Sequence, residues 1–300
     1  MCDKSGEQMN STDRVRSPTR IYRDRLTDST RWQAFRPRVG DIVVSTPPKS
    51  GTTWVQAILA LLISGDPQVN AQPSINAPWI DISAREVAEV ITRLEAQRGR
   101  RQVKSHTPFD GLPIWEDLRY ICVYRHPIDV HFSFRRHAAN LAQAGRGVYF
   151  PADPIQSFHG FLNDDSFDAA SLQMICDHYR SALDLAGQEN LLCLHYADMC
   201  RDPAAAVHRI AGHIGVSHPG ALMEQLIQAA SFTNMKANAG RFAPGAGVGF
   251  WRDDAGFFDT ASSGKWHGVL SESDLAQYRA RLAGLLNRDE QRWLEQGGAA

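Results

Sequence analysis

The chain has 300 residues, and its 32 Lys and Arg almost balance its 33 Asp and Glu, for a formal net charge of −1. This length can bury the core of one large α/β domain or of two smaller domains. The near-neutral charge provides no general attraction to nucleic acid or to a membrane surface, so we expect neither as a partner.

The cysteines and the apolar segments indicate where the protein resides. The five cysteines form no Cys-x-x-Cys pair and their number is odd, which favours free thiols in a reducing cytoplasm. The N-terminus lacks the apolar core of a signal peptide. The longest apolar run, near Ala57 to Ile63, is too short to cross a bilayer. We therefore expect a soluble, cytoplasmic protein.

Residues 1–38 are rich in arginine interspersed with polar and acidic residues. This composition predicts a solvated, partly flexible N-terminal arm, with a binding arm as the alternative. The remaining chain is predicted to form one α/β domain over residues 39–296, followed by a frayed C-terminus at 297–300. The arginines of the arm are Arg14, Arg16, Arg20, Arg23, Arg25, Arg31, Arg36 and Arg38.

The first element of the domain predicts a phosphate-binding loop. An apolar strand at Ile42 to Val44 is followed by Pro47-Pro48, a polar loop Lys49-Ser-Gly-Thr-Thr53, and an apolar helix. Backbone N–H groups and the helix dipole concentrate positive potential in such a loop. The loop differs from a Walker A motif because its lysine precedes the only glycine, Gly51. An ordinary strand-to-helix turn capped by threonine is the alternative.

The later elements alternate between strands and helices, which predicts a mostly parallel sheet with ligands at the carboxyl ends of its strands. Ser83 and Glu86 have the spacing of a capping box for a helix through about Gln97. Residues 241–268 show no periodicity and predict a long loop that is either functional or mobile. The expected strands are 100–105, 120–124 and 190–196. Further helices are expected at 172–185, 203–214 with Asp202 as N-cap, 222–230, and from Ser271 to about Leu286.

Three predicted strands end in polar residues suited to group transfer. The first ends in the Lys49 loop, the second at Lys104-Ser-His106, and the third at Arg125, with Ser133 on the next helix. An anion loop, a histidine and an arginine at one sheet edge fit transfer from a phosphorylated donor to an acceptor that the histidine deprotonates. Taken alone, the histidine could be structural and the arginine could pair with Asp129.

The order of these motifs resembles the cytosolic-type sulfotransferases, which use 3′-phosphoadenosine 5′-phosphosulfate (PAPS). The resemblance extends from about Asp41 to Trp266, most of the chain. It implies a single α/β domain with a P-loop-like strand-loop-helix. The matching segments are Lys49-Ser-Gly-Thr-Thr-Trp54, Lys104-Ser-His106, Arg125-His-Pro-Ile-Asp129 with Ser133, Tyr196-Ala-Asp-Met199, Ser231-Phe-Thr-Asn-Met-Lys236 and Gly264-Lys-Trp266.

The resemblance implies a role for each matching residue in holding the donor. The 5′-phosphate would be held by Lys49, Ser50, Gly51, Thr52 and Thr53. The adenine would lie against Trp54, with Tyr196, Phe232 and the segment containing Ser231 and Met235 nearby. The 3′-phosphate would be bound by Arg125 and Ser133. The same pocket would release adenosine 3′,5′-bisphosphate (PAP).

The resemblance also implies an in-line displacement with His106 as the general base. Lys49 would stabilise the leaving phosphate, Lys104 would assist at the sulfuryl group, and Ser133 would complete the catalytic set. Such transfer demands mainly alignment and charge stabilisation from the protein. The sequence has no cluster of ligands with metal-binding spacing, so we expect no metal requirement.

The chain departs from the family at the far end of the donor. Asp259-Thr-Ala261 replaces the arginine-lysine-glycine triplet that grips the 3′-phosphate in the animal enzymes. Either Arg252 or Arg241 supplies the missing charge, or the loop closes differently; weak donor binding is a further alternative. The dimer motif of the animal members is not evident, which leaves a monomer or a homodimer.

Aromatic residues in the variable loops predict a small, apolar or aromatic acceptor that carries one hydroxyl. Ordinary core packing is the alternative for each of them. A nucleotide-kinase-like phosphotransferase and a non-catalytic nucleotide-binding relative remain as competing functions. The candidate acceptor walls are Trp79-Ile80, Tyr149-Phe150, and Phe242 to Phe250 with Trp251.

Overall fold

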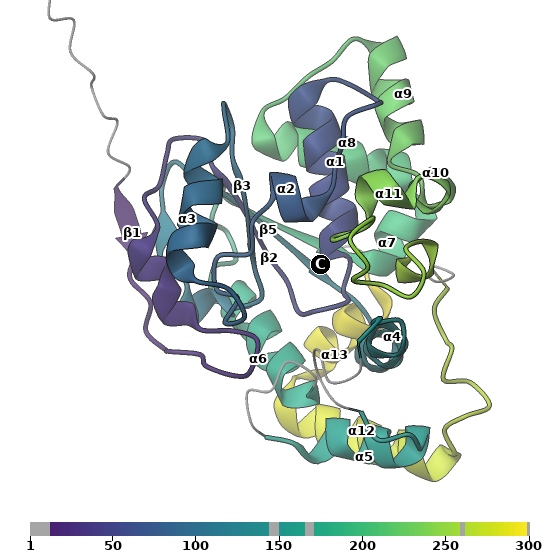
Figure 1. Ribbon diagram of the computed structural model, residues 1–300. Helices are drawn as coiled ribbons and strands as arrows, with labels where there is room; N and C mark the ends of the chain where they lie inside the picture. Colours follow the sequence, from purple (N-terminus) through teal and green to yellow (C-terminus); the bar gives the residue numbers. More distant parts are fainter. Residues whose placement is uncertain (1–12, 144–149, 166–170, 259–261, 299–300) are drawn as a thin grey trace, which may run out of the picture.

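The computed structural model describes residues 13–143, 150–165, 171–258 and 262–298. At its centre lies a parallel four-stranded sheet with the strand order β3-β2-β5-β6 (Figure 1). The carboxyl ends of all four strands therefore meet at one edge, and the prediction of a mostly parallel α/β sheet is confirmed. The strands are β2 (Ile42–Ser45), β3 (Gln102–Ser105), β5 (Arg119–Tyr124) and β6 (Leu191–His195).

Helices cover both faces of the sheet, because successive side chains of each buried strand point to opposite sides. Ile42 and Val44 of β2 pack on one side, whereas Val43 packs on the other. The first side is covered by α1 (Thr52–Ser64), α8 (Pro203–Ile214) and α9 (Gly220–Ala229). The second side is covered by α3 (Val87–Ala96), α6 (Leu172–Leu183), α12 (Glu272–Leu285) and α13 (Arg288–Gln296).

The remaining elements are two further helices and several short segments. Helix α4 (Pro127–Ala139) follows β5 closely and has Pro127 in its first turn, where proline needs no backbone N–H partner. Helix α5 is Pro154–Asn163. The short helices are α2 (Pro73–Asn76), α7 (Tyr196–Arg201), α10 (Phe232–Ala237) and α11 (Ala239–Phe242), with 3₁₀ turns η1 (Ser29–Ala34), η2 (Phe109–Gly111) and η3 (Ala255–Phe257).

The described part of the N-terminal segment differs from the solvated arm predicted from its arginines. Strand β1 (Arg14–Arg16) pairs antiparallel with β4 (Ile114–Trp115). Tyr22, Trp32 and Phe35 are at most 3% exposed. The ring centroids of Trp32, in η1, and of Phe35, its C-cap residue, lie 6.5 and 5.6 Å from that of Trp115. Burial of these aromatic side chains outweighs the solvation of the intervening arginines, so residues 13–38 pack onto the domain.

The predicted starts of two helices had opposite outcomes. Ser271 is the N-cap of α12, as predicted, and it forms a capping box with Asp274. The box predicted at Ser83 and Glu86 was wrong, because α3 begins at Val87 and has no side-chain cap. The backbone N–H of Ser83 donates instead to Leu26 O at 2.7 Å, so this segment pairs with the N-terminal region of the chain.

Candidate active site

The loop between β2 and α1 has the backbone conformation of an anion cradle. Lys49 has φ 64° and Gly51 has φ 123°, both in the left-handed region. A Cβ at Gly51 would lie 3.2 Å from the Tyr196 ring, so this position also needs the space that glycine leaves. Gly51 caps α1 without a side-chain hydrogen bond, and Thr52 and Thr53 of the first turn line the pocket described below. The first N–H groups of an α-helix have no partner within the helix and can bind an anion.

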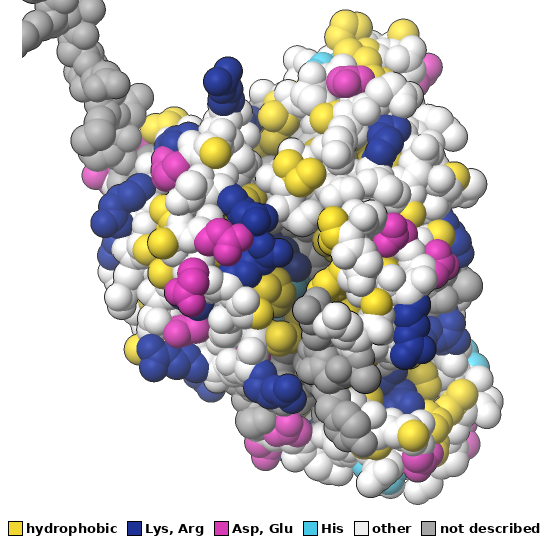
Figure 2. All heavy atoms as spheres, viewed as in Figure 1, with side chains coloured by type: hydrophobic (Ala, Val, Ile, Leu, Met, Phe, Trp, Pro, Cys, Tyr) yellow, Lys and Arg dark blue, Asp and Glu magenta, His cyan; other side chains and the backbone are white. Residues whose placement is uncertain are grey.

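A pocket of about 480 Å³ opens beside this loop, at the carboxyl ends of the central strands. Figure 2 shows a hollow in this face of the molecule, with Lys and Arg side chains gathered beside it. Five Lys and Arg side chains line the pocket, and no Asp or Glu is found among the described lining residues. Most of the residues predicted for the site line it: Lys49, Gly51, Thr52, Thr53, Trp54, Lys104, His106, Arg125, Ser133, Tyr196, Ser231, Phe232 and Met235.

His106 lies at the end of β3 with only 7% of its side chain exposed. Its Nδ1 is 2.6 Å from the carbonyl oxygen of Thr46. Because a carbonyl only accepts, Nδ1 carries the hydrogen and Nε2 keeps its lone pair. Burial, and next the charge of Lys104, lower the pKa of His106 well below 6.5. The ring is therefore neutral at pH 7 and can accept a proton through Nε2.

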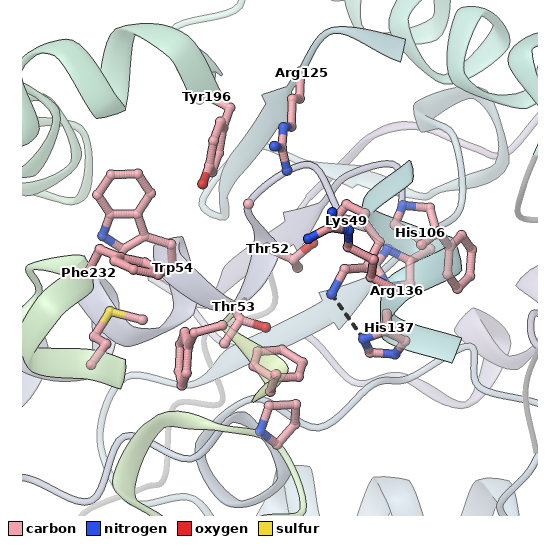
Figure 3. Close-up of a pocket in the computed structure, with 18 of the residues that line it drawn as sticks. Lys49, Thr52, Thr53, Trp54, His106, Arg125, Arg136, His137, Tyr196 and Phe232 are labelled. Atoms are coloured by element: carbon pink, nitrogen blue, oxygen red, sulfur yellow. Dashed lines mark hydrogen bonds between the residues drawn. The ribbon is translucent and has the colours of Figure 1, made fainter. Parts of the chain in front are cut away.

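Two lysines reach the pocket from the ends of neighbouring strands. Lys49 Nζ lies 2.9 Å from His137 Nδ1 (Figure 3). It also lies 4.7 Å from the centroid of the Phe257 ring. Lys104 Nζ lies 4.3 Å from the Trp79 ring centroid. Burial lowers the pKa of Lys104 to about 8, against the opposing attraction of Asp81. The site therefore holds positive charge in an environment that screens it poorly.

Arg125 is held at the end of β5 by a ring and by a backbone carbonyl. Its guanidinium carbon lies 4.3 Å from the Tyr196 ring centroid, and Nη2 donates to Ser262 O at 3.1 Å. Asp129, the possible ion-pair partner in the sequence, accepts instead from the backbone N–H of Gly264 at 2.7 Å. Arg125 is thus fixed toward the pocket, with its charge available to an anion.

Aromatic and thioether side chains form the wall beyond Gly51. Trp54 donates its indole N–H to Ala230 O at 2.9 Å and meets the Tyr196 ring edge-on at 5.8 Å. Phe232 and Met235, from α10, line the same wall. A flat heteroaromatic ring fits such a surface through stacking and apolar contact.

Some predicted site residues lie away from the pocket. Ser50 is fully buried, and its Oγ has no hydrogen-bond partner in the described structure. Arg252 is exposed and its Nε donates to Leu141 O at 3.1 Å. Arg241 donates to the carbonyls of Pro67 and Val69, outside the pocket lining. The triplet 259–261 lies outside the described residues.

The expected acceptor walls are only partly at the pocket. Trp79 lines it, whereas Ile80 and Phe242 are fully buried in the core. Trp251 packs behind it, 4.7 Å from the His137 ring and 5.2 Å from the Phe257 ring. Tyr149 lies outside the described residues, and Phe150 contacts rings of α4.

The structure brings to the pocket several residues that the sequence reasoning did not identify. Arg136 and His137 follow Ser133 on α4 by three and four positions, and residues with this spacing share a helix face. That periodicity could have identified them. Phe134, Phe257, Phe258 and Lys265 also line the pocket. Lys265 lies within the matching segment Gly264-Lys-Trp266, and Phe257 and Phe258 lie within the predicted loop 241–268, but sequence reasoning assigned none of them a role in the site.

Comparison with known proteins identifies the family. The sulfotransferase domain model matches residues 39–288, and the chain therefore belongs to the sulfotransferase domain family. A glycolipid sulfotransferase of Mycobacterium tuberculosis is 29% identical, over 95% of each chain. Rat sulfotransferase 1 family member D1 is 26% identical, over 69% of each chain. The protein is accordingly a sulfotransferase enzyme.

Solved structures support the fold. A mouse sulfotransferase complexed with PAP aligns with a TM-score of 0.69 at 19% identity, covering 89% of this chain and 92% of that one. Retinol dehydratase in a complex with retinol and PAP aligns with a TM-score of 0.70 at 19% identity, covering 85% and 83%. Within the described residues, no helix combines the length and apolar character needed to cross a membrane.

Proposed function

We propose that this protein transfers a sulfuryl group from PAPS to a hydroxyl of a small, amphiphilic or apolar acceptor. The observation that carries the proposal is the convergence of His106, Lys49 and Arg125 on one cation-lined pocket. Family membership supports this reaction over the nucleotide-kinase-like transfer and the non-catalytic role left open by the sequence.

The described residues fit a donor with two separated anionic groups. The Lys49 loop and the first turn of α1 would hold the 5′-phosphosulfate, and Trp54 with Phe232 would contact the adenine. Arg125 and Ser133 would bind the 3′-phosphate. Lys265 lines the same pocket and follows the segment 262–264, which is tied to Arg125 and Asp129. We therefore assign to Lys265, rather than to Arg252 or Arg241, the charge lost from the triplet 259–261.

The catalytic roles follow from the protonation states and positions of the side chains. PAPS supplies the activated sulfuryl group. His106 Nε2 would take the proton of the acceptor hydroxyl while the new O–S bond forms and the S–O bond to phosphate breaks. Lys49 would stabilise the negative charge that develops on the leaving phosphate oxygen, and Lys104 the sulfuryl oxygens. Each such interaction in a dry site can contribute several kcal/mol.

The acceptor side of the pocket combines rings with charged groups. Trp79, Phe134 and Phe257 offer apolar surface, and Arg136 and His137 offer polar atoms among them. The mycobacterial relative is named a glycolipid sulfotransferase, which makes a sugar hydroxyl on a lipid the first acceptor to test. A sugar hydroxyl beside an apolar body suits this mixed lining.

The test combines donor binding with a base variant. We expect calorimetric titration to show binding of PAP without Mg²⁺ and much weaker binding of ATP with Mg²⁺. His106→Ala should lower sulfate transfer from labelled PAPS by about 10²- to 10⁴-fold, the usual contribution of a general base, without loss of PAP binding. His208→Ala, an exposed histidine on α8, is the matched control. Preference for ATP with Mg²⁺, or full transfer activity in His106→Ala, would contradict the proposal.

A further inference from the structure

Side chains from two distant parts of the chain contact the Lys49 ammonium in the pocket. Lys49 Nζ lies 2.9 Å from Nδ1 of His137, on α4 (Figure 3). It also lies 4.7 Å from the ring centroid of Phe257, in η3. The ammonium donates and the imidazole nitrogen accepts, so the hydrogen of this ring sits on Nε2. A lysine side chain that bears the proposed catalytic charge is thus fixed at its far end.

His137 is itself held firmly. Its ring meets Trp251 at 4.7 Å, Phe257 at 5.7 Å and Phe134 at 6.0 Å, all at steep angles. Burial among these rings, and next the charge of Lys49, lower the pKa of His137 well below 6.5. A protonated imidazole would repel the lysine, whereas the neutral ring can accept its N–H at pH 7. The aromatic contacts fix both the place and the protonation state that this hydrogen bond requires.

We infer that His137 is a positioning residue for Lys49, acting through the Nδ1 contact, in the reaction proposed above. It does not touch the reacting atoms in this scheme. The Lys49 side chain has four rotatable bonds and loses conformational freedom when its ammonium is fixed. His137 and Phe257 restrict that freedom before the donor binds, so less is lost when Lys49 reaches the leaving oxygen. The expected effect on the transfer rate rests on the proposed function, whereas the contact between His137 and Lys49 does not.

Two substitutions separate the hydrogen bond from the packing. His137→Phe keeps a ring against Trp251 and Phe257 but removes the acceptor. His137→Gln keeps an acceptor oxygen and loses the ring. We expect kcat to fall about tenfold or more in H137F and to recover most of that loss in H137Q, with PAP affinity within about threefold of wild type in both. A purely structural role predicts the reverse order, because H137F retains the packing.

An NMR measurement without donor or acceptor tests the hydrogen bond between Lys49 and His137 independently of activity. The ¹⁵N-labelled lysine ammonium of Lys49, assigned through Lys49→Arg, should give a slowly exchanging Nζ–H signal in wild type and H137Q and lose it in H137F. A signal that persists unchanged in H137F overturns the inference, as does a kcat for H137F equal to that of wild type. If wild type shows the signal but transfers no sulfate to any acceptor, the positioning contact stands and the proposed function fails.

Discussion

At the scale of single residues, two backbone conformations shape the phosphate loop. A non-glycine residue at positive φ, such as Lys49, is strained by roughly 1–2 kcal/mol. At Gly51 a Cβ would also press against Tyr196 and Val123, at 3.2 and 3.3 Å. The strained loop directs Lys49 toward the pocket, while Tyr196 packs close behind it. The sequence predicted the loop itself, because its pattern is local, whereas the contacts of Gly51 with Tyr196 and Val123 join distant segments.

The proposed role of Lys265 at the 3′-phosphate of the donor can be tested by a pair of substitutions. Lys265→Ala should weaken PAP binding about tenfold, equivalent to about 1.4 kcal/mol, because a charge-assisted contact to the 3′-phosphate is lost. Arg252→Ala, whose side chain lies outside the pocket lining, should leave the affinity unchanged. Calorimetry with adenosine 5′-monophosphate, which lacks the 3′-phosphate, provides the second control. Equal PAP affinity for wild type and Lys265→Ala would refute this assignment.

At the scale of elements, the sheet is anchored at the edge opposite the site by a buried ion pair. Arg101, which precedes β3, is fully buried and donates to both carboxylate oxygens of Asp41, which precedes β2, at 2.9 and 2.6 Å. The same guanidinium donates to Glu95 and to Arg36 O. Asp41 and Arg101 thus link the two strands that carry Lys49 and His106.

Removal of one partner of this pair should destabilise the whole domain. Asp41→Asn removes the carboxylate that pairs with the buried Arg101 guanidinium. We expect the free energy of unfolding to fall by about 3 kcal/mol. Asp117→Asn, an exposed carboxylate near the same strand ends, should change it by less than about 0.5 kcal/mol. Urea denaturation of both variants checks this. A loss for Asp41→Asn no larger than for Asp117→Asn would show that Glu95 alone satisfies the guanidinium.

Local patterns predicted most of the elements but could not decide how each one is used. The capping-box spacing occurs at both Ser83 and Ser271, yet only Ser271 caps a helix. Ser83 is instead drawn into backbone pairing with Leu26, and Thr27 forms a bridge with Ile82. Such a contact joins segments far apart in the chain, so no local window contains it. The second C-terminal helix, α13, was not predicted, although Asn287 and Glu290 form a capping box there.

At the scale of the whole molecule, buried neutral histidines couple stability to pH. Burial lowers the pKa of His178 to about 3 and, together with the charge of Arg135, that of His131 to about 3. The unfolded chain binds these protons near pH 6.5. Between those values the unfolded state holds more protons than the folded state, so protons favour unfolding. Stability is therefore complete above about pH 6.5 and declines as the pH falls toward 3.

This decline can be measured and assigned. Each such histidine contributes a slope of up to about 1.4 kcal/mol per pH unit within the window. We expect the urea midpoint of wild type to be clearly lower at pH 5.0 than at pH 7.5. His131→Phe, within a cluster of phenylalanine rings, should reduce the difference, whereas the exposed His208→Gln should not. Equal midpoints at the two pH values in wild type would contradict the assignment.

The sequence by itself determined the α/β class, the phosphate loop, and the polar residues at the strand ends. Those features follow from short-range patterns and from the rule that parallel strands bring their carboxyl ends together. Only the tertiary structure decided the rest: the packing of residues 13–38, the position of Arg252 outside the pocket, and the arrival of His137, Phe257 and Lys265 beside the loop. Each depends on contacts between distant segments, which are set by burial and shape across the whole core.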